Sequence, residues 1–140
     1  MSRYFIDTNV FIFLTIERSS GLTHEVIDII SDYSNQICMS SQVVNEVIQL
    51  FQQGKIKDSR WKTASDIVDF IKNEAEIEIK YIKEEHLRTL AKLPLFEDHK
   101  DPADRMIIAH AINDKIPLIS SDRKFKLYQK SGLEFVFNKR

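Results

Sequence analysis

Cysteine, glycine and proline are all scarce in this sequence. Cys38 is the only cysteine among 140 residues, which excludes an internal disulfide and a multi-cysteine zinc site. Three glycines and three prolines leave no flexible linker between domains, and no glycine-rich phosphate-binding loop is present. We therefore expect a helix-rich chain that forms a single domain over residues 1–140.

Long apolar runs and an excess of charge of one sign are also missing. No stretch approaches the roughly 20 apolar residues that cross a bilayer. The apolar start of the chain is interrupted by Asp7 and Asn9 and lacks the features of a signal peptide. The formal net charge of -1 disfavours a protein that coats nucleic acid non-specifically, although an acidic site would offset basic substrate contacts in a nuclease. We expect a cytoplasmic protein without membrane association.

Hydrophobic patterns predict strands that alternate with helices. Short apolar runs typical of buried strands lie at 3–7, 36–40, 76–82, 117–122 and 133–137. Helical patterns lie at 9–18, 24–33, 40–56, 83–93 and 101–115, with a long polar helix at about 60–75 and a short helix through 126–130. This alternation predicts a three-layer α/β/α fold with a central parallel sheet of about four to five strands. In such folds the functional site lies at the carboxyl ends of the strands.

Three acidic residues are candidates for such a site, and each also has an ordinary structural alternative. Asp7 and Asp122 each end a predicted strand, where an aspartate also commonly caps the following helix or turn. Glu46 lies at the edge of the apolar arc of the helix at 43–51, where the alternative is a border glutamate that extends into water. Taken singly, none of the three requires a functional role.

Asp104 is the most informative acid. It lies in the first turn of the helix predicted to begin after Asp101, where the alternative is a capping box. It also shares a face with the apolar residues of this helix, which is apolar almost all round and should be buried. Because a carboxylate on a buried face is costly unless it is paired or binds a cation, we interpret Asp104 as functional. We assign Asp101 mainly to capping, with a supporting role at the site as a second possibility.

Together these four acids favour a divalent cation. Carboxylate oxygens without a histidine or cysteine cluster suit Mg²⁺ or Mn²⁺, and crowded carboxylates need a cation to offset their mutual repulsion. Such a site can activate water and stabilise charge on a phosphoryl group. The histidines lack the spacing of metal ligands, so we expect structural roles for His24, His86, His99 and His110.

The order of these motifs resembles that of the PIN-domain family and, within it, of the VapC-type toxins of toxin–antitoxin pairs. The resemblance covers nearly the whole chain. It rests on Asp7-Thr8-Asn9 after the first strand, Ser40 with Glu46 six residues later, the helix start HKDPADRMIIAHA with Asp104, and LISSDRKF with Asp122.

The resemblance implies a Mg²⁺-supported endonuclease of single-stranded RNA that forms a homodimer and is inhibited by a small antitoxin protein. It implies that the catalytic and metal-binding residues are Asp7, Glu46, Asp104 and Asp122, and that the residues supporting them are Thr8, Asn9, Ser120 and Asp101. Ala103 stands where relatives often carry an aromatic residue, and Ser120 where many carry threonine. Neither departure removes a carboxylate, so we expect an active enzyme.

Basic residues flank the acids and predict a path for RNA. They are Lys100, Arg105, Arg123, Lys124 and Lys126. For each of them the alternative is a solvated surface charge, and Arg105 has the further alternative of pairing with a neighbouring carboxylate. The apolar segments at 11–14 and 26–30 add to the expectation of a dimer, because they offer more apolar surface than one small core requires.

Three alternative functions stay open at this point. One is a catalytically silent PIN-like domain that binds only RNA or a partner protein. The presence of all four acids counts against it. Another is an aspartyl phosphotransfer or phosphatase domain with Asp7 as nucleophile, but that chemistry commonly uses a second acid where this chain has Asn9. The third is a nuclease that acts on DNA.

Overall fold

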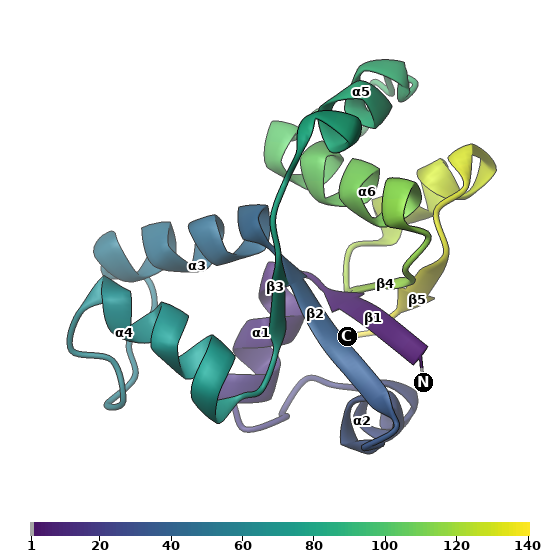
Figure 1. The fold of residues 1–140 in the computed structure, drawn as a ribbon. Helices are drawn as coiled ribbons and strands as arrows, with labels where there is room; N and C mark the ends of the chain where they lie inside the picture. Colours follow the sequence, from purple (N-terminus) through teal and green to yellow (C-terminus); the bar gives the residue numbers. More distant parts are fainter. Residues whose placement is uncertain (1) are drawn as a thin grey trace.

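A parallel sheet of five strands lies at the centre of the computed structural model, which describes residues 2–140 (Figure 1). The strands are β1 Ser2–Ile6, β2 Asn35–Ser40, β3 Glu78–Lys80, β4 Leu118–Ser120 and β5 Phe135–Phe137. Their order across the sheet is β3-β2-β1-β4-β5, and each neighbouring pair is parallel. The predicted α/β fold with a parallel sheet is confirmed, with five strands at the upper end of the expected number.

Helices cover both faces of this sheet. They are α1 Thr8–Thr15, α2 His24–Ser31, α3 Ser41–Gln52, α4 Ala64–Asp69, the π-helix η1 Phe70–Glu74, α5 Glu84–Lys92, α6 Pro102–Asp114 and the 3-10 helix η2 Arg123–Ser131. Figure 1 shows α5 and α6 together on one side of the sheet and α1 and α2 on the other. The predicted three-layer arrangement is confirmed. No helix in residues 2–140 is long and apolar enough to cross a membrane.

Helix α6 is buried along its middle. Asp101 caps its start, since one carboxylate oxygen accepts the backbone N–H groups of Ala103 and Asp104 at 2.8 and 3.1 Å. Pro102 occupies the first helical position, where its missing N–H costs nothing. Residues 106–111 are all buried, as the apolar pattern predicted.

The segment predicted as a long polar helix differs from the expectation in two ways. Thr63 caps α4 and exchanges hydrogen bonds with Asp66, so the helix begins only at Ala64. Its continuation widens into η1, which places the buried side chains of Phe70 and Ile71 in the core. The predicted helix is confirmed over 64–74, shorter than expected, and it is not polar on every side, because a few apolar residues at the right spacing are enough to bury one face.

The sheet changes its winding direction between β1 and β4. The chain adds β2 and β3 on one side of β1, then crosses to place β4 and β5 on the other. At such a switch point the connections after the two central strands diverge, which leaves a crevice at their carboxyl ends. Asp7 directly follows β1, and its backbone N–H donates to the carbonyl of Ile119 in β4 at 3.0 Å. The topology therefore places Asp7 at the crevice.

Candidate metal centre

Asp7 is held between the two central strands by hydrogen bonds to both of its carboxylate oxygens. The backbone N–H of Thr8 donates to Oδ1 at 2.7 Å, and the hydroxyl of Ser120 donates to Oδ2 at 2.7 Å. Burial raises the pKa of Asp7, the charges of Asp122 and Asp101 raise it further, and the two hydrogen bonds lower it only in part. A carboxylate with a raised pKa is destabilised in its charged form, and a nearby cation would relieve this.

Ser120 joins Asp7 to the end of β4. Its hydroxyl oxygen accepts the backbone N–H of Asp122 at 3.1 Å while its hydrogen is donated to Asp7. Asp122 in turn accepts the backbone N–H of Lys124 at 2.9 Å and so caps η2. The capping alternative for Asp122 is therefore observed, with its second carboxylate oxygen making no hydrogen bond within residues 2–140.

Glu46 reaches the same crevice from α3. The hydroxyl of Thr8 donates to Glu46 Oε2 at 3.0 Å. The other oxygen, Oε1, is buried and has no hydrogen-bond partner within residues 2–140. Burial is the largest cause of the raised pKa of Glu46, followed among the raising causes by the charges of Asp7 and Asp101. Glu46 is thus not a border glutamate that extends into water, because its carboxylate lies among other acids.

Asp104 completes the group from the first turn of α6. Burial, together with the charges of Asp7, Asp101, Glu46 and Asp122, raises the pKa of Asp104 to about 8. Asp101 caps this helix, but the Asp104 carboxylate accepts no hydrogen bond from the backbone N–H of Asp101 within residues 2–140, so the capping box is incomplete. The four predicted acids and Asp101 are therefore close enough to repel one another at a single site.

This donor set fits a hard divalent cation. These acids offer carboxylate oxygens only, and Glu46 Oε1 is buried without a hydrogen-bond partner in residues 2–140. Their negative charges also repel one another. An orphaned buried carboxylate oxygen is costly, and a Mg²⁺ or Mn²⁺ ion bound by such oxygens would offset that cost.

His99 also belongs to this site, which the sequence prediction missed. It is buried, and its Nε2 lies 3.2 Å from Asp104 Oδ2. One nitrogen of His99 and one oxygen each of Asp104 and Asp122 all lie within 4.8 Å of one another. No spacing rule could have revealed this contact, because His99 precedes the cap of α6 and a turn folds it back onto the helix. The only sequence signal was its place two residues before Asp101.

The predicted RNA-binding cations have varied surroundings. Lys100 pairs with Glu97 at 3.1 Å on the surface, while Lys124 and Lys126 are exposed. The guanidinium of Arg105 donates to the carbonyl of Pro94 at 2.8 Å, and no ion pair joins it to an acid within residues 2–140. The alternative in which Arg105 pairs with a carboxylate was therefore wrong.

Arg123 and Asn9 are the remaining residues of the predicted site. The guanidinium of Arg123 lies 5.8 Å from the centre of the Phe137 ring. Asn9 is exposed and makes no side-chain hydrogen bond within residues 2–140, so nothing in its contacts supports the predicted role beside the metal.

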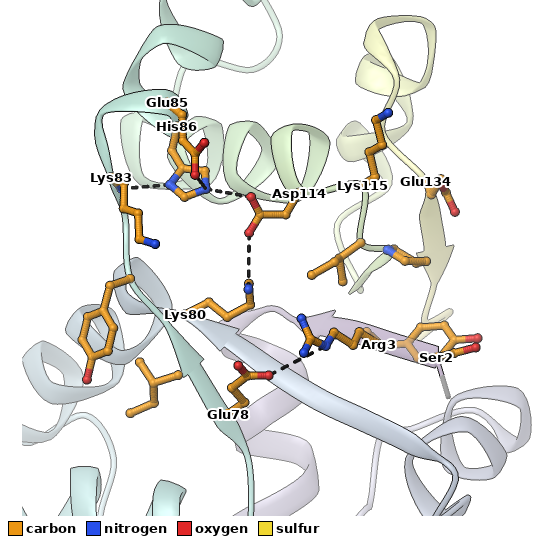
Figure 2. Close-up of a pocket in the computed structure, with 15 residues that line it drawn as sticks. Ser2, Arg3, Glu78, Lys80, Lys83, Glu85, His86, Asp114, Lys115 and Glu134 are labelled. Atoms are coloured by element: carbon orange, nitrogen blue, oxygen red, sulfur yellow. Dashed lines mark hydrogen bonds and ion pairs between the residues drawn. The ribbon is translucent and has the colours of Figure 1, made fainter.

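A second group of potential ligands lies at the opposite end of α6, beside a cavity of about 850 Å³ (Figure 2). It consists of His86, His110 and Asp114. The backbone N–H of Lys83 donates to His86 Nδ1 at 2.9 Å, so the hydrogen of the neutral ring is on Nε2, which donates to Asp114 Oδ1 at 2.8 Å. His86 therefore has no lone pair for a metal. The predicted structural roles of His86 and His110 agree with these contacts.

The comparisons with known proteins agree with this fold. The family model for the PIN domain matches residues 4–131. No curated protein matches the chain in sequence.

Several solved structures share the fold over nearly their full length. A chain of VapBC2 from Rickettsia felis, bound to a DNA fragment from its promoter, is 16% identical and has a TM-score of 0.68, with 98% of this chain and 99% of that chain covered. A chain of DNA-bound VapBC from Salmonella typhimurium is 18% identical with a TM-score of 0.66, and 98% of both chains is covered. A chain of VapBC-5 from Mycobacterium tuberculosis, a member of the VapBC family of toxin–antitoxin systems, is 14% identical with a TM-score of 0.62 and full coverage of both chains. Identities this low establish similarity of fold alone.

Proposed function

The chain belongs to the PIN domain family, and we propose that it is a metal-dependent endoribonuclease that cleaves single-stranded RNA as the toxin of a toxin–antitoxin pair. The observation that supports this most strongly is the group of acids at the switch point of the sheet. Burial and mutual repulsion raise the pKa values of Asp7, Glu46 and Asp104. A protein gains nothing in stability from such crowding, so a site that binds a cation accounts for it best.

The proposed metal ligands are Asp7, Glu46, Asp104 and Asp122, with Mg²⁺ or Mn²⁺ as the ion. When bound, the ion would supply Lewis-acid chemistry, in which a water nucleophile loses its proton more readily and charge on the phosphoryl group is stabilised. The chain's own residues orient the ligands: Ser120 fixes Asp7, and Thr8 fixes Glu46. Asp101 holds the start of α6 and adds negative charge nearby.

The phosphotransfer alternative receives less support from the sequence. That chemistry commonly uses a second acid two residues after the nucleophilic aspartate, where this chain has Asn9. We therefore propose hydrolysis by water rather than phosphoryl transfer to Asp7.

The proposed RNA path uses the exposed cations beside the acids. Lys124 and Lys126 follow Asp122 on η2 and are exposed. An acidic pocket repels phosphate unless the metal and nearby cations reverse the local field, which gives these lysines a physical role. Arg105 is a weaker candidate than the sequence indicated, because its guanidinium already holds the Pro94 carbonyl.

We propose a small antitoxin protein and a second copy of the chain as partners, the antitoxin because the similar solved structures are VapBC proteins. The apolar segment at 11–14 supports a dimer less than expected. Phe11 and Phe13 of the apolar segment at 11–14 are buried in the chain's own core, so they offer no surface to a partner. Light scattering at high protein concentration tests the dimer, and a strictly monomeric protein would contradict it.

Cleavage of labelled single-stranded RNA tests the proposed activity. EDTA should abolish cleavage, added Mg²⁺ or Mn²⁺ should restore it, and duplex RNA and single-stranded DNA should be poorer substrates. Glu46→Gln should lose activity, whereas Glu78→Gln, a matched change on β3, should retain it. Cleavage that survives thorough chelation would contradict the metal mechanism. A protein that binds the ion but cleaves no RNA would favour the catalytically silent alternative.

A further inference from the structure

A chain of hydrogen bonds leads from Arg105 to the acid cluster. The Arg105 guanidinium donates to the Tyr128 hydroxyl at 3.4 Å, that hydroxyl lies 2.8 Å from His99 Nδ1, and His99 Nε2 lies 3.2 Å from Asp104 Oδ2. Tyr128 is fully buried and His99 is 4% exposed. The His99 ring also packs edge-on against Tyr128 and Phe125, at 5.3 and 5.7 Å between ring centres. The hydrogen bonds and these ring contacts together fix the orientation of the His99 ring.

The donors in this chain all point the same way. A guanidinium can only donate, so the Tyr128 oxygen accepts from Arg105 and its own hydrogen is available to His99 Nδ1. A neutral imidazole that accepts at Nδ1 carries its hydrogen at Nε2, and that hydrogen is donated to Asp104.

We propose that His99 is a positioning residue of the metal centre, which fixes the Asp104 carboxylate through its Nε2–H and leaves Asp104 Oδ1 as the ligand. This inference rests on the proposed function. Asp104 Oδ1 makes no hydrogen bond within residues 2–140, whereas Oδ2 is taken by His99. A carboxylate held by one oxygen keeps its plane and presents the other oxygen in a single direction, and such outer partners are known to strengthen metal binding.

Direct ligation of the metal by His99 is the competing role, and the same contacts argue against it. A metal at Nε2 would move the ring hydrogen to Nδ1, which faces the Tyr128 hydroxyl. Tyr128 would then accept from both His99 and Arg105, and its own hydrogen would need another acceptor in a fully buried position. The observed polarity satisfies all three groups without that cost.

His86 provides a matched control for an experiment. It is also buried, also accepts a hydrogen bond at Nδ1, and also donates from Nε2 to a carboxylate of α6, namely Asp114. The two histidines thus make similar contacts at opposite ends of one helix. A change at His86 should affect the stability of the fold without affecting the proposed metal site.

Calorimetric titration of Mn²⁺ into the metal-free protein, with RNA cleavage measured in parallel, tests the inference. His99→Ala should weaken Mn²⁺ binding by about 10- to 100-fold. His99→Gln should restore part of the affinity, because its amide can donate to Asp104. Tyr128→Phe, which keeps the ring but removes the hydroxyl, should weaken binding less than His99→Ala. His86→Gln should bind Mn²⁺ like the unaltered protein.

The contrary outcomes are distinct. Unchanged Mn²⁺ affinity in folded His99→Ala would overturn the positioning role, and if that variant does not fold, unchanged affinity in folded Tyr128→Phe would overturn it. A nitrogen coupling to bound Mn²⁺ in pulsed electron paramagnetic resonance that His99→Gln removes would show direct ligation and overturn it as well. If the unaltered protein binds no Mn²⁺ and cleaves no RNA, the proposed function fails and this inference fails with it.

Discussion

Replacing Asp104 with asparagine should stabilise the protein in the absence of metal, and only at higher pH. The folded protein keeps the Asp104 proton up to a pH of about 8, whereas the unfolded chain loses it near the ordinary value of 3.8. Between these values the folded state binds more protons, so its stability falls as the pH rises through this window. Asparagine has no proton to lose, and the variant should escape this part of the decline. In acid, where both states carry the proton, the two proteins should be about equally stable.

The size of the effect follows from the same pKa. One unit of pKa is worth about 1.4 kcal/mol, so the whole difference sets an upper bound of about 6 kcal/mol. The side chain is 23% exposed, and solvent reaching this carboxylate reduces the cost of its charge. We therefore expect about 2–3 kcal/mol at about pH 9. For a chain of this length, that corresponds to a rise in Tm of roughly 6–12 °C.

Chemical denaturation in EDTA, at about pH 5 and about pH 9, measures this effect. Asp114→Asn is the control at the other end of α6 and should behave in the opposite way. Burial acts to raise the pKa of Asp114, but hydrogen bonds from His86 and Asn113 outweigh burial and hold it below its usual value. Its charge therefore stabilises the fold above the ordinary pKa, and the asparagine variant should be less stable at both pH values. A loss of stability in Asp104→Asn at about pH 9 would instead show that the charged Asp104 carboxylate stabilises the fold, contrary to this prediction.

Three further predictions concern the substrate path, the support of Asp7 and the core. The double change of Lys124 and Lys126 to alanine should weaken RNA binding and reduce its salt dependence, while metal affinity stays unchanged. Fluorescence anisotropy at several salt concentrations measures the RNA binding, and calorimetry measures the metal affinity. Ser120→Ala should weaken Mn²⁺ binding by about tenfold or more, because Asp7 Oδ2 loses its hydrogen-bond donor, and Ser120→Thr should bind Mn²⁺ like the unaltered protein. Equal Mn²⁺ affinities of Ser120→Ala and the unaltered protein in calorimetry would contradict this. Ile107→Ala in the buried face of α6 should cost about 2–5 kcal/mol in denaturant unfolding, and a smaller loss would mean that the site collapses around the deletion.

Much of the fold follows from local patterns that the sequence makes visible. Residues 106–111 of α6 are buried, and all of them but His110 are apolar, while Asp101 with Pro102 marks the start of that helix. Strand ends were harder to predict. The apolar pattern at 76–82 forms a strand only over Glu78–Lys80, where it pairs with Cys38–Ser40, and because β2 ends at Ser40 it has no residue to pair with Tyr81 or Ile82. The number of residues that pair depends on both strands, so it cannot be predicted from one segment of the sequence.

The acids of the candidate site could be predicted because strand ends and helix starts are themselves sequence features. Asp7 follows a strand and Asp104 lies in a marked helix start, so the topology alone brings them to one crevice. His99 could not be predicted, because its contact with Asp104 depends on the path of a turn. The burial of part of the segment at 11–14 could not be predicted for a related reason, since Phe11 packs against Trp61, fifty residues further along the chain.

Anomalous scattering from a crystal of the protein grown with Mn²⁺ locates the bound ion directly. We expect an anomalous peak bounded by Asp7, Glu46, Asp104 and Asp122, with oxygen ligands and with His99 in contact with Asp104 rather than with the ion. A crystal saturated with Mn²⁺ that shows no peak among these acids, or that shows the ion instead at His86, His110 and Asp114, would contradict it.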